Sequence, residues 1–206
     1  MPLTGVIFLG GGHGKRLNGV VKPLLTLEGK TLLDYSLQAL DDSVGHTRTI
    51  AVTAPDHRLP PGMPQTLEDP PFGGPVAGIS VGLTYLYPNK NYPDTGCERI
   101  AIFTGDAPLA PLLLPRLLSH ATERDGAICQ WDGRLNYLIG VYDVTALARA
   151  LPENPHGCSA RKVLGALDLA IVTDDEHFSA DIDIPDDICR VQRLIHTHLG
   201  TRSANT

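Results

Sequence analysis

The sequence predicts an α/β fold in which crossover helices cover a mostly parallel sheet. Short apolar, β-prone segments alternate with segments whose apolar residues recur at helical spacing, as such a sheet requires. A run of glycines begins at residue 10, where the first of these β-prone segments ends. Open parallel sheets bind ligands at that end of their strands, so we expect a ligand site there. With 206 residues the chain suits one substantial core, and we expect a single domain over residues 1–200.

Local patterns predict the elements of the first half of the chain. Residues 5–9 are apolar and β-prone, and residues 49–53 are β-branched, so both segments are predicted strands. Apolar residues at helical spacing predict helices over 32–40 and 78–86. The segment 60–71 is rich in proline and is predicted to loop over the surface.

The second half continues the same alternation. An apolar strand over 99–104 precedes a predicted helix over 112–123. Short strands over 127–130 and 137–142 are predicted to form a hairpin around the turn at 131–134. The remaining expected elements are a helix over 160–167, a strand over 169–173, a helix over 186–199 begun by Pro185, and a frayed polar tail over 201–206.

Composition excludes several classes of function. The net charge of −6 lacks the basic surface that a nucleic-acid partner requires. No apolar stretch approaches the roughly 18 residues that span a bilayer, and the N-terminus lacks the pattern of a secretory signal. We therefore expect a cytoplasmic protein without membrane or nucleic-acid partners, and a monomer is favoured.

Cysteine and histidine spacing gives no metal motif. The four cysteines (Cys97, Cys129, Cys158 and Cys189) form no CxxC pair, which argues against a zinc site or a redox motif. His196 and His198 are two residues apart, so a helix would direct them to different faces. Ordinary reduced thiols are expected.

The glycine-rich segment has the composition of a phosphate-binding loop. Glycine lets backbone N–H groups approach an anion closely, and Lys15, Arg16 and Lys22 add charge that a plain turn does not need. The spacing is not that of a Walker P-loop, because Arg16 stands where Ser or Thr is required. A dinucleotide-binding GxGxxG would need glycine where Lys15 or Leu17 stands. A structural glycine-rich turn is the alternative.

Three aspartates are candidate metal ligands. Asp106 follows the apolar strand over 99–104, so the sheet would fix its position and its oxygens would reach the cleft. Carboxylate oxygens are the ligands that Mg²⁺ prefers. Asp181 and Asp183 alternate in an extended stretch before a helix, which places them on one side of the chain. Capping of the following helices is the alternative role for these carboxylates.

Three segments resemble the motifs of one family of nucleotidyltransferases. Residues 9–25, LGGGHGKRLNGVVKPLL, are similar without a gap to LAGGxxxRMGGxDKxLL, the approximate signature of the molybdenum cofactor guanylyltransferases, with departures at Leu17, Asn18 and Val21. Residues 105–108, GDAP, resemble the segment CDMP or GDQP, whose Asp binds the metal. Residues 181–188 resemble a third segment, which reads NxNTPEDL in most guanylyltransferases and DIDTPEDL in the molybdenum cofactor cytidylyltransferases and other relatives. This chain follows the acidic version, with Ile184 in place of Thr.

The resemblance implies a three-layer Rossmann-like sandwich with a mostly parallel twisted sheet, known as the nucleotide-diphospho-sugar transferase fold. It implies Mg²⁺ as cofactor, held by Asp106 with Asp181 or Asp183, of which Asp183 is slightly favoured. Arg16, Lys22 and Asp106 would be the catalytic residues. The nucleotide-binding residues would be Leu9, Gly10, Gly11, Gly12, Gly14, Lys15, Arg16, Lys22, Asp69, Gly74, Pro75, Gly78 and Asp106.

Two further segments take roles from the same resemblance. Glu68–Ile79 is similar to D…GPLAGI, in which the acidic residue helps recognise guanine, and Asp69 would have that role here. A carboxylate suits guanine because it can accept from both the ring N–H and the exocyclic amine. Asn136 lies in a stretch that resembles the border of the acceptor site, although a core hairpin strand is an equal alternative.

The implied reaction is Mg²⁺-dependent transfer of GMP from GTP onto a phosphate-bearing acceptor of the molybdopterin type, with release of pyrophosphate. Two alternatives keep this chemistry: CTP with molybdopterin, suggested by Asp181 and Asp183, and GTP with cobinamide phosphate, suggested by Lys22-Pro23-Leu24. A more distant alternative is a nucleotide-binding module without catalysis.

Overall fold

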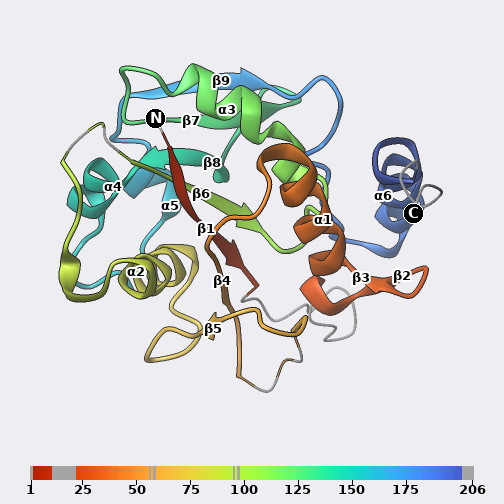
Figure 1. The fold of residues 1–206 in the computed structure, drawn as a ribbon, viewed down its shortest axis with the longest axis horizontal. Helices are drawn as coiled ribbons and strands as arrows, with labels where there is room; N and C mark the ends of the chain where they lie inside the picture. The colour runs from red at the N-terminus through yellow and green to blue at the C-terminus, as the bar shows by residue number, and fades with distance from the viewer. Residues whose placement is uncertain are drawn as a thin grey trace.

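The computed structural model describes residues 2–10, 22–55, 57, 59–94, 96 and 98–200. Its centre is a seven-stranded sheet in the order β5-β4-β1-β6-β8-β7-β9 (Figure 1). The strands are β1 (Leu3–Leu9), β4 (Thr49–Val52), β5 (Gln65–Thr66), β6 (Arg99–Thr104), β7 (Gly126–Trp131), β8 (Arg134–Asp143) and β9 (Leu169–Thr173). Only β8 runs antiparallel to its neighbours in this sheet, so the predicted α/β fold with a mostly parallel sheet is confirmed.

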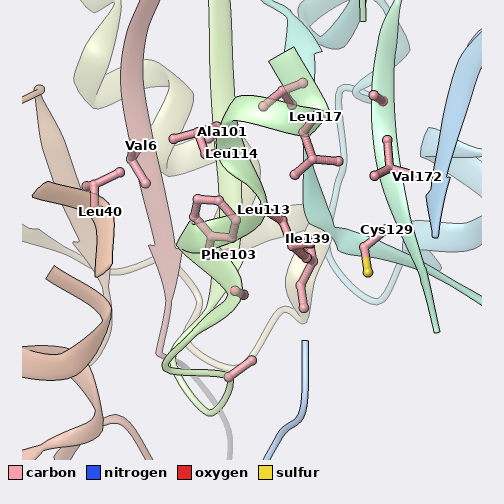
Figure 2. Packing of buried hydrophobic residues seen from close by; sticks show 14 of the residues in the cluster. Val6, Leu40, Ala101, Phe103, Leu113, Leu114, Leu117, Cys129, Ile139 and Val172 are labelled. Carbon is pink, nitrogen blue, oxygen red and sulfur yellow. The ribbon is translucent and has the colours of Figure 1, made fainter. Parts of the chain in front are cut away.

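Helices cover both faces of the sheet because side chains alternate along each strand. Val6 and Phe8 of β1 belong to a buried cluster that includes residues of α1 (Leu32–Val44) and α3 (Leu114–His120). Figure 2 shows side chains of this cluster, with Phe103 of β6 near its middle. Ile7 faces the other way and joins a second cluster. The helices that contribute to this second cluster are α2 (Pro75–Leu86), α4 (Val144–Ala150) and α5 (Ala160–Leu164).

The C-terminal helix α6 (Pro185–Leu199) packs outside α1 rather than on the sheet (Figure 1). A third cluster joins Val191 and Ile195 of α6 to Leu32 and Tyr35 of α1, and it includes Ile182 from the segment before α6. A short antiparallel hairpin, β2 (Thr26–Leu27) with β3 (Lys30–Thr31), precedes α1. These contacts bring the residues before α6 close to α1 and to the hairpin that precedes it.

Proline and glycine explain where the helices differ from the prediction. Helix α2 begins three residues earlier than predicted, because Pro75 occupies its first turn and Gly74 at the N-cap has φ of 87°. The helix predicted over 112–123 is instead a 3₁₀ helix, η4 (Ala110–Leu113), followed by α3, which ends at His120. Glu123 has φ of 62°, outside the helical region. Helix α5 ends at Leu164, before Gly165, rather than at residue 167.

Several short elements were not predicted. Helix α4 follows β8 directly, and the Asp143 carboxylate caps it by accepting from the amide of Ala146 at 2.8 Å. The proline-rich segment contains β5, and two further 3₁₀ helices are η2 (Lys22–Leu24) and η3 (Pro88–Lys90). The tail predicted to fray, residues 201–206, lies outside the described residues. Across the described part of the chain, every helix is too short or too polar to cross a membrane.

Candidate active site

The strand order reverses between β1 and β6, in the middle of the sheet. After β1 the chain adds β4 and β5 on one side, and from β6 it continues to the other side. The amide of Gly105 donates to the Leu9 carbonyl, and the amide of Gly10 donates to the Val52 carbonyl, both at 2.9 Å. Open α/β sheets bind ligands at such a reversal, outside the carboxyl ends of the strands.

Pro23 packs against the ends of both central strands and thereby places Lys22. Its buried side chain occupies the space that a Cβ on Gly10 or on Gly105 would enter. A Cβ on Gly105 would lie 2.5 Å from Pro23 Cγ, and one on Gly10 would lie 3.2 Å from the same atom. The two glycines therefore make room for the proline, which holds η2 at the reversal point.

Lys22 connects β6 to the segment before α6. Its Nζ donates to Asp106 Oδ2 at 3.0 Å and also to Asp183 Oδ1. Burial by itself lowers the pKa of Lys22, but the hydrogen bond to Asp183 and the charge of Asp106 outweigh burial and raise that pKa above its ordinary value. Lys22 is therefore a cation at neutral pH, held between two carboxylates.

Ile182 directs Asp181 and Asp183 to the same side. Its side chain is fully buried in the cluster between α1 and α6, and its amide donates to the carbonyl of Asp106 at 3.2 Å. Residues 181–183 lie outside any strand, yet their side chains alternate in direction as expected of an extended chain. Because Ile182 points into the core, the two flanking aspartates point toward Asp106.

A buried carboxylate fixes the turn that leads into this segment. Asp174 is 2% exposed and accepts from the amides of Phe178 and Ser179, at 3.0 and 2.7 Å, and from the Ser179 hydroxyl at 2.6 Å. The amide of Asp174 donates in turn to the Gln130 carbonyl, at the end of β7, at 2.8 Å. The chain therefore enters the aspartate segment from a turn tied to the sheet.

Asp106, Asp181 and Asp183 form one acidic cluster. Each offers a carboxylate oxygen, and these three oxygens lie within 4.8 Å of one another. Burial, followed by the charges of Asp106 and Asp183, raises the pKa of Asp181. A nearby cation would relieve this repulsion, and carboxylate oxygens are the ligands that hard divalent cations prefer. The donor set fits Mg²⁺.

The carboxylate that stabilises the start of α6 belongs to Asp187 rather than to this cluster. The N-cap residue is Ile184. Asp187 Oδ2 accepts from the amides of Asp183 and Ile184, at 2.9 and 3.0 Å. The capping role considered for Asp181 or Asp183 is therefore wrong. Likewise the N-cap of η4 is Leu109, so Asp106 does not cap the helix that follows it.

The loop before α2 is held by contacts at Gly73. Its amide donates to Glu68 Oε1 at 3.2 Å, and its carbonyl accepts from the amide of Gly157 at 2.7 Å. Asp69 is exposed, and its bond to Pro70 is cis. Gly78 is buried, and a Cβ there would lie 3.1 Å from Leu9 Cδ2, so its lack of a side chain lets α2 pack closely on β1.

Asn136 lies at an irregularity in the hairpin between β7 and β8. Cys129 pairs with Asn136 whereas the adjacent Ile128 pairs with Gly140, so three extra residues bulge from β8. Asn136 Oδ1 accepts from the amide of Leu138, inside this bulge, at 3.0 Å. The hydrogen bond described for the Asn136 side chain therefore joins it to its own strand.

Comparison with known proteins identifies the family. A family model described as "MobA-like NTP transferase domain" matches residues 6–171, most of the chain. The chain belongs to the MobA-like NTP transferase family. One relative of this transferase, the molybdenum cofactor guanylyltransferase of Acidiphilium cryptum, is 32% identical over 161 residues, which are 77% of this chain and 76% of the relative. A 2-C-methyl-D-erythritol 4-phosphate cytidylyltransferase of Cereibacter sphaeroides is 27% identical over 96% of this chain and 99% of its own length.

Solved structures share the fold of the transferase. Molybdopterin-guanine dinucleotide biosynthesis protein A from Archaeoglobus fulgidus superposes with a TM-score of 0.65 at 20% identity, covering 94% of this chain and 100% of that one. Rv0371c from Mycobacterium tuberculosis, solved in complex with manganese, gives 0.64 at 18% identity, covering 94% and 99%. The expected nucleotide-diphospho-sugar transferase fold is thus confirmed, and the transferase is a nucleotidyltransferase.

The structure brings together one group of the predicted site residues and leaves others apart. Lys22, Asp106, Asp181 and Asp183 meet at the reversal point, beside Leu9 and Gly10. Gly74 and Pro75 begin α2, and Gly78 lies within this helix, on the side that packs on Leu9 of β1. Five predicted phosphate-loop residues lie outside the described part of the chain: Gly11, Gly12, Gly14, Lys15 and Arg16.

Sequence reasoning missed the residues that support the site. The sequence pattern marks Pro23 only as part of a motif and indicates no role for Asp174, Asp187 or Arg190. One signal was present: Asp187 stands three residues after Ile184, the spacing at which a side chain in the first helical turn can reach back to the N-cap. Pro23 and Arg190 act through contacts with distant segments, at Gly105 and Trp131, whereas Asp174 acts within its own turn.

Proposed function

We propose that this transferase moves GMP from GTP onto a phosphate-bearing acceptor of the molybdopterin type and releases pyrophosphate. The observation that carries the proposal is the meeting of Lys22 with Asp106 and Asp183 at the reversal of strand order. A cation beside a carboxylate cluster suits a reaction whose catalysis consists of positioning phosphates and balancing their charge. Relatives named molybdenum cofactor guanylyltransferase support the choice of substrates.

Asp106, Asp181 and Asp183 would hold Mg²⁺, and their oxygens lie close enough to share one ion. When bound, Mg²⁺ would neutralise phosphate charge during nucleotidyl transfer. The manganese complex of Rv0371c, which has the same fold, supports a divalent cation in this transferase.

The protein's own residues would bind and orient the two substrates. The attacking group is a phosphate that is already an anion, so the reaction needs no general base. Its oxygen attacks the α-phosphorus of GTP, a new P–O bond forms, and the bond to pyrophosphate breaks. Lys22 would offset charge at the α-phosphate, and the loop containing Arg16 would hold the β- and γ-phosphates. Asp69, exposed in the loop before α2, would accept hydrogen bonds from guanine.

Substitution of Asp106 tests the proposed site. Asp106→Asn keeps the size of the side chain but removes the charge, and we expect pyrophosphate release with GTP and a molybdopterin acceptor to fall at least about 100-fold. The matched control is Asp168→Asn, whose carboxylate forms an exposed ion pair with Arg124. That control should release pyrophosphate at the rate of the unmodified protein. Full activity of Asp106→Asn would remove Asp106 from the site.

A second candidate is the same transfer from CTP. It is favoured by the similarity to 2-C-methyl-D-erythritol 4-phosphate cytidylyltransferases, and by the acidic residues at positions 181 and 183. Thermal unfolding with each of GTP, CTP, ATP and UTP, with and without Mg²⁺, separates the two candidates. Stabilisation by CTP alone would overturn the choice of GTP. No pyrophosphate release with any nucleotide and acceptor would favour a binding module without catalysis.

We further propose that residues 1–200 act as one domain, in a monomer located in the cytoplasm. The single central sheet, to which strands from both halves of the chain contribute, supports one domain. Light scattering after gel filtration tests the monomer, limited proteolysis tests the domain, and cell fractionation tests the location.

A further inference from the structure

Arg190 of α6 contacts three parts of the structure near the aspartate segment. Its Nη2 lies 3.0 Å from Asp187 Oδ1 in an ion pair and donates to the backbone carbonyl of Asp181 at 3.1 Å. The guanidinium carbon lies 5.3 Å from the ring centroid of Trp131, close enough for a cation–π interaction. Arg190 therefore joins the first turns of α6 to Asp181 and to the end of β7.

The two side chains that contact Arg190, those of Asp187 and Trp131, are themselves held in place. Asp187 spans the other end of the segment, because its Oδ2 accepts from the amides of Asp183 and Ile184. Trp131 Nε1 donates to His177 Nδ1 at 3.0 Å, and the two rings meet edge to face with centroids 5.8 Å apart. The four side chains of Trp131, His177, Asp187 and Arg190 thus form one connected network.

We propose that Arg190 and Asp187 are positioning residues that hold Asp181 and Asp183 in the geometry that binds a divalent cation. The inference rests on the metal site of the proposed function. Neither residue needs to touch the cation, because both act on backbone atoms of the segment: the carbonyl of residue 181 and the amides of residues 183 and 184. Trp131 and His177 fix the orientation of Arg190.

Charge repulsion explains why the segment needs this support. Three carboxylates gathered within 4.8 Å repel one another, and Lys22 pairs with only two of them, Asp106 and Asp183. Asp181 and Asp183 also stand in a short segment without strand pairing. A planar guanidinium can donate to the Asp181 carbonyl, pair with Asp187 and stack on the indole at the same time. A lysine ammonium at this position could not keep all three contacts.

Binding of Mn²⁺ to the nucleotide-free protein, followed by electron paramagnetic resonance, tests the proposal without relying on activity. Arg190→Gln should weaken Mn²⁺ binding about 10-fold or more, as expected when residues that orient metal ligands are lost. Arg190→Lys should restore only part of the affinity. At saturating Mg²⁺ the kcat of Arg190→Gln should return close to that of the unmodified protein. The matched control is Arg193→Gln, one turn further along α6, whose Nε donates to the Cys189 carbonyl.

The outcomes separate this proposal from the proposed function. Mn²⁺ affinity that is unchanged in Arg190→Gln would overturn the positioning role, even if the melting temperature fell. If Arg190→Gln does not fold, Asp187→Asn and Trp131→Leu replace it, and unchanged Mn²⁺ affinity in both would overturn the role. Asp106→Asn serves as the reference variant. Undiminished Mn²⁺ binding by Asp106→Asn would instead reject the metal site itself.

Discussion

Lys22 reaches the aspartates because Pro23 fills the space left by two glycines. Gly105 is the more restrictive of the two, since a Cβ there would lie 2.5 Å from Pro23 Cγ and 3.0 Å from Pro23 Cβ. A contact this short between a rigid ring and a new methyl group cannot be relieved by a rotamer change. The position of the Lys22 ammonium therefore depends on Pro23, a residue that carries no functional group.

Gly105→Ala should impair catalysis more than folding. The added methyl group should displace Pro23 and move Lys22 away from Asp106, so we expect kcat to fall at least about 10-fold, because small misplacements of active-site groups are costly. The free energy of unfolding should fall by about 1–3 kcal/mol. Steady-state kinetics and urea unfolding measure the two effects. The double variant Gly105→Ala with Pro23→Ala should recover part of the stability, and strictly additive losses would contradict the predicted clash.

Asp181→Asn should stabilise the metal-free protein at neutral pH. Burial and two neighbouring carboxylates raise the pKa of Asp181 in the folded state. The charged form therefore costs stability above that pKa, and the cost disappears as the pH falls through it. With EDTA present, the melting temperature of Asp181→Asn should exceed that of the unmodified protein at pH 7 and match it near pH 3. Asp186→Asn, at an exposed position, is the control. A lower melting temperature at pH 7 would contradict the prediction.

At the scale of single helices and strands, the start of β6 is fixed by a buried arginine that contacts distant segments. Arg99, at the start of β6, is 2% exposed and donates to the carbonyls of Ala121 and Arg124, at 2.8 and 2.9 Å. Its Nη1 lies 3.7 Å from Oδ2 of Asp143, which caps α4. Burial lowers the pKa of Arg99, although the charge of Asp143 opposes this effect. One buried ion pair thus connects β6, α4 and the turn after α3.

Arg99→Ala should destabilise the fold by about 3–5 kcal/mol, because it leaves the buried carboxylate of Asp143 without its cation. Guanidinium unfolding measures the change. Arg124→Ala is the control, since its ion pair with Asp168 is exposed and worth about 1 kcal/mol at most. Equal effects of the two substitutions would show that the Arg99 pair contributes no more than a surface pair.

At the scale of the whole molecule, the site lies at the ends of the two central strands, β1 and β6. Strands β1 and β6 are paired on both sides and covered on both faces, and residues such as Ile7, Ala101 and Ile102 are fully buried. The acidic segment 181–183 reaches the end of β6 from the far side of the sheet, after β9, and is held there by α6 packing on α1. Asp106 therefore follows a central strand, β6, whereas Asp181 and Asp183 come from a segment that follows the edge strand β9.

Hydrogen exchange should show this difference in local stability. Amides of β1 and β6 should exchange most slowly, because opening them breaks the centre of the sheet, whereas those of the edge strands β5 and β9 should exchange faster. Adding GTP with Mg²⁺ should protect residues 105–107 and 181–183 but leave η3 unchanged. Mass spectrometry of the exchanged protein measures both effects. Slower exchange in β9 than in β6 would contradict this ordering.

Strong local patterns predicted most of the fold. The strands β6 and β9 have the predicted bounds because each is an apolar segment with clear ends. The helix predicted over 112–123 failed because local periodicity does not show that the chain changes from a 3₁₀ helix to α3 at Leu114, beside Pro115. Helix α4 was missed because its cap, Asp143, also ends a strand and pairs with Arg99.

The sequence by itself determined the fold class and indicated three aspartates suited to a hard cation. These features depend on residue type and local spacing, which the chain order contains directly. Only the tertiary structure decided that Ile182 turns Asp181 and Asp183 toward Asp106, that Pro23 seats Lys22 between the strand ends, and that Arg190 holds the segment. These arrangements rely on contacts between residues far apart in the chain: Ile182 with Asp106, Pro23 with Gly105 and Arg190 with Trp131. Such contacts depend on strand order and close packing, which no local pattern specifies.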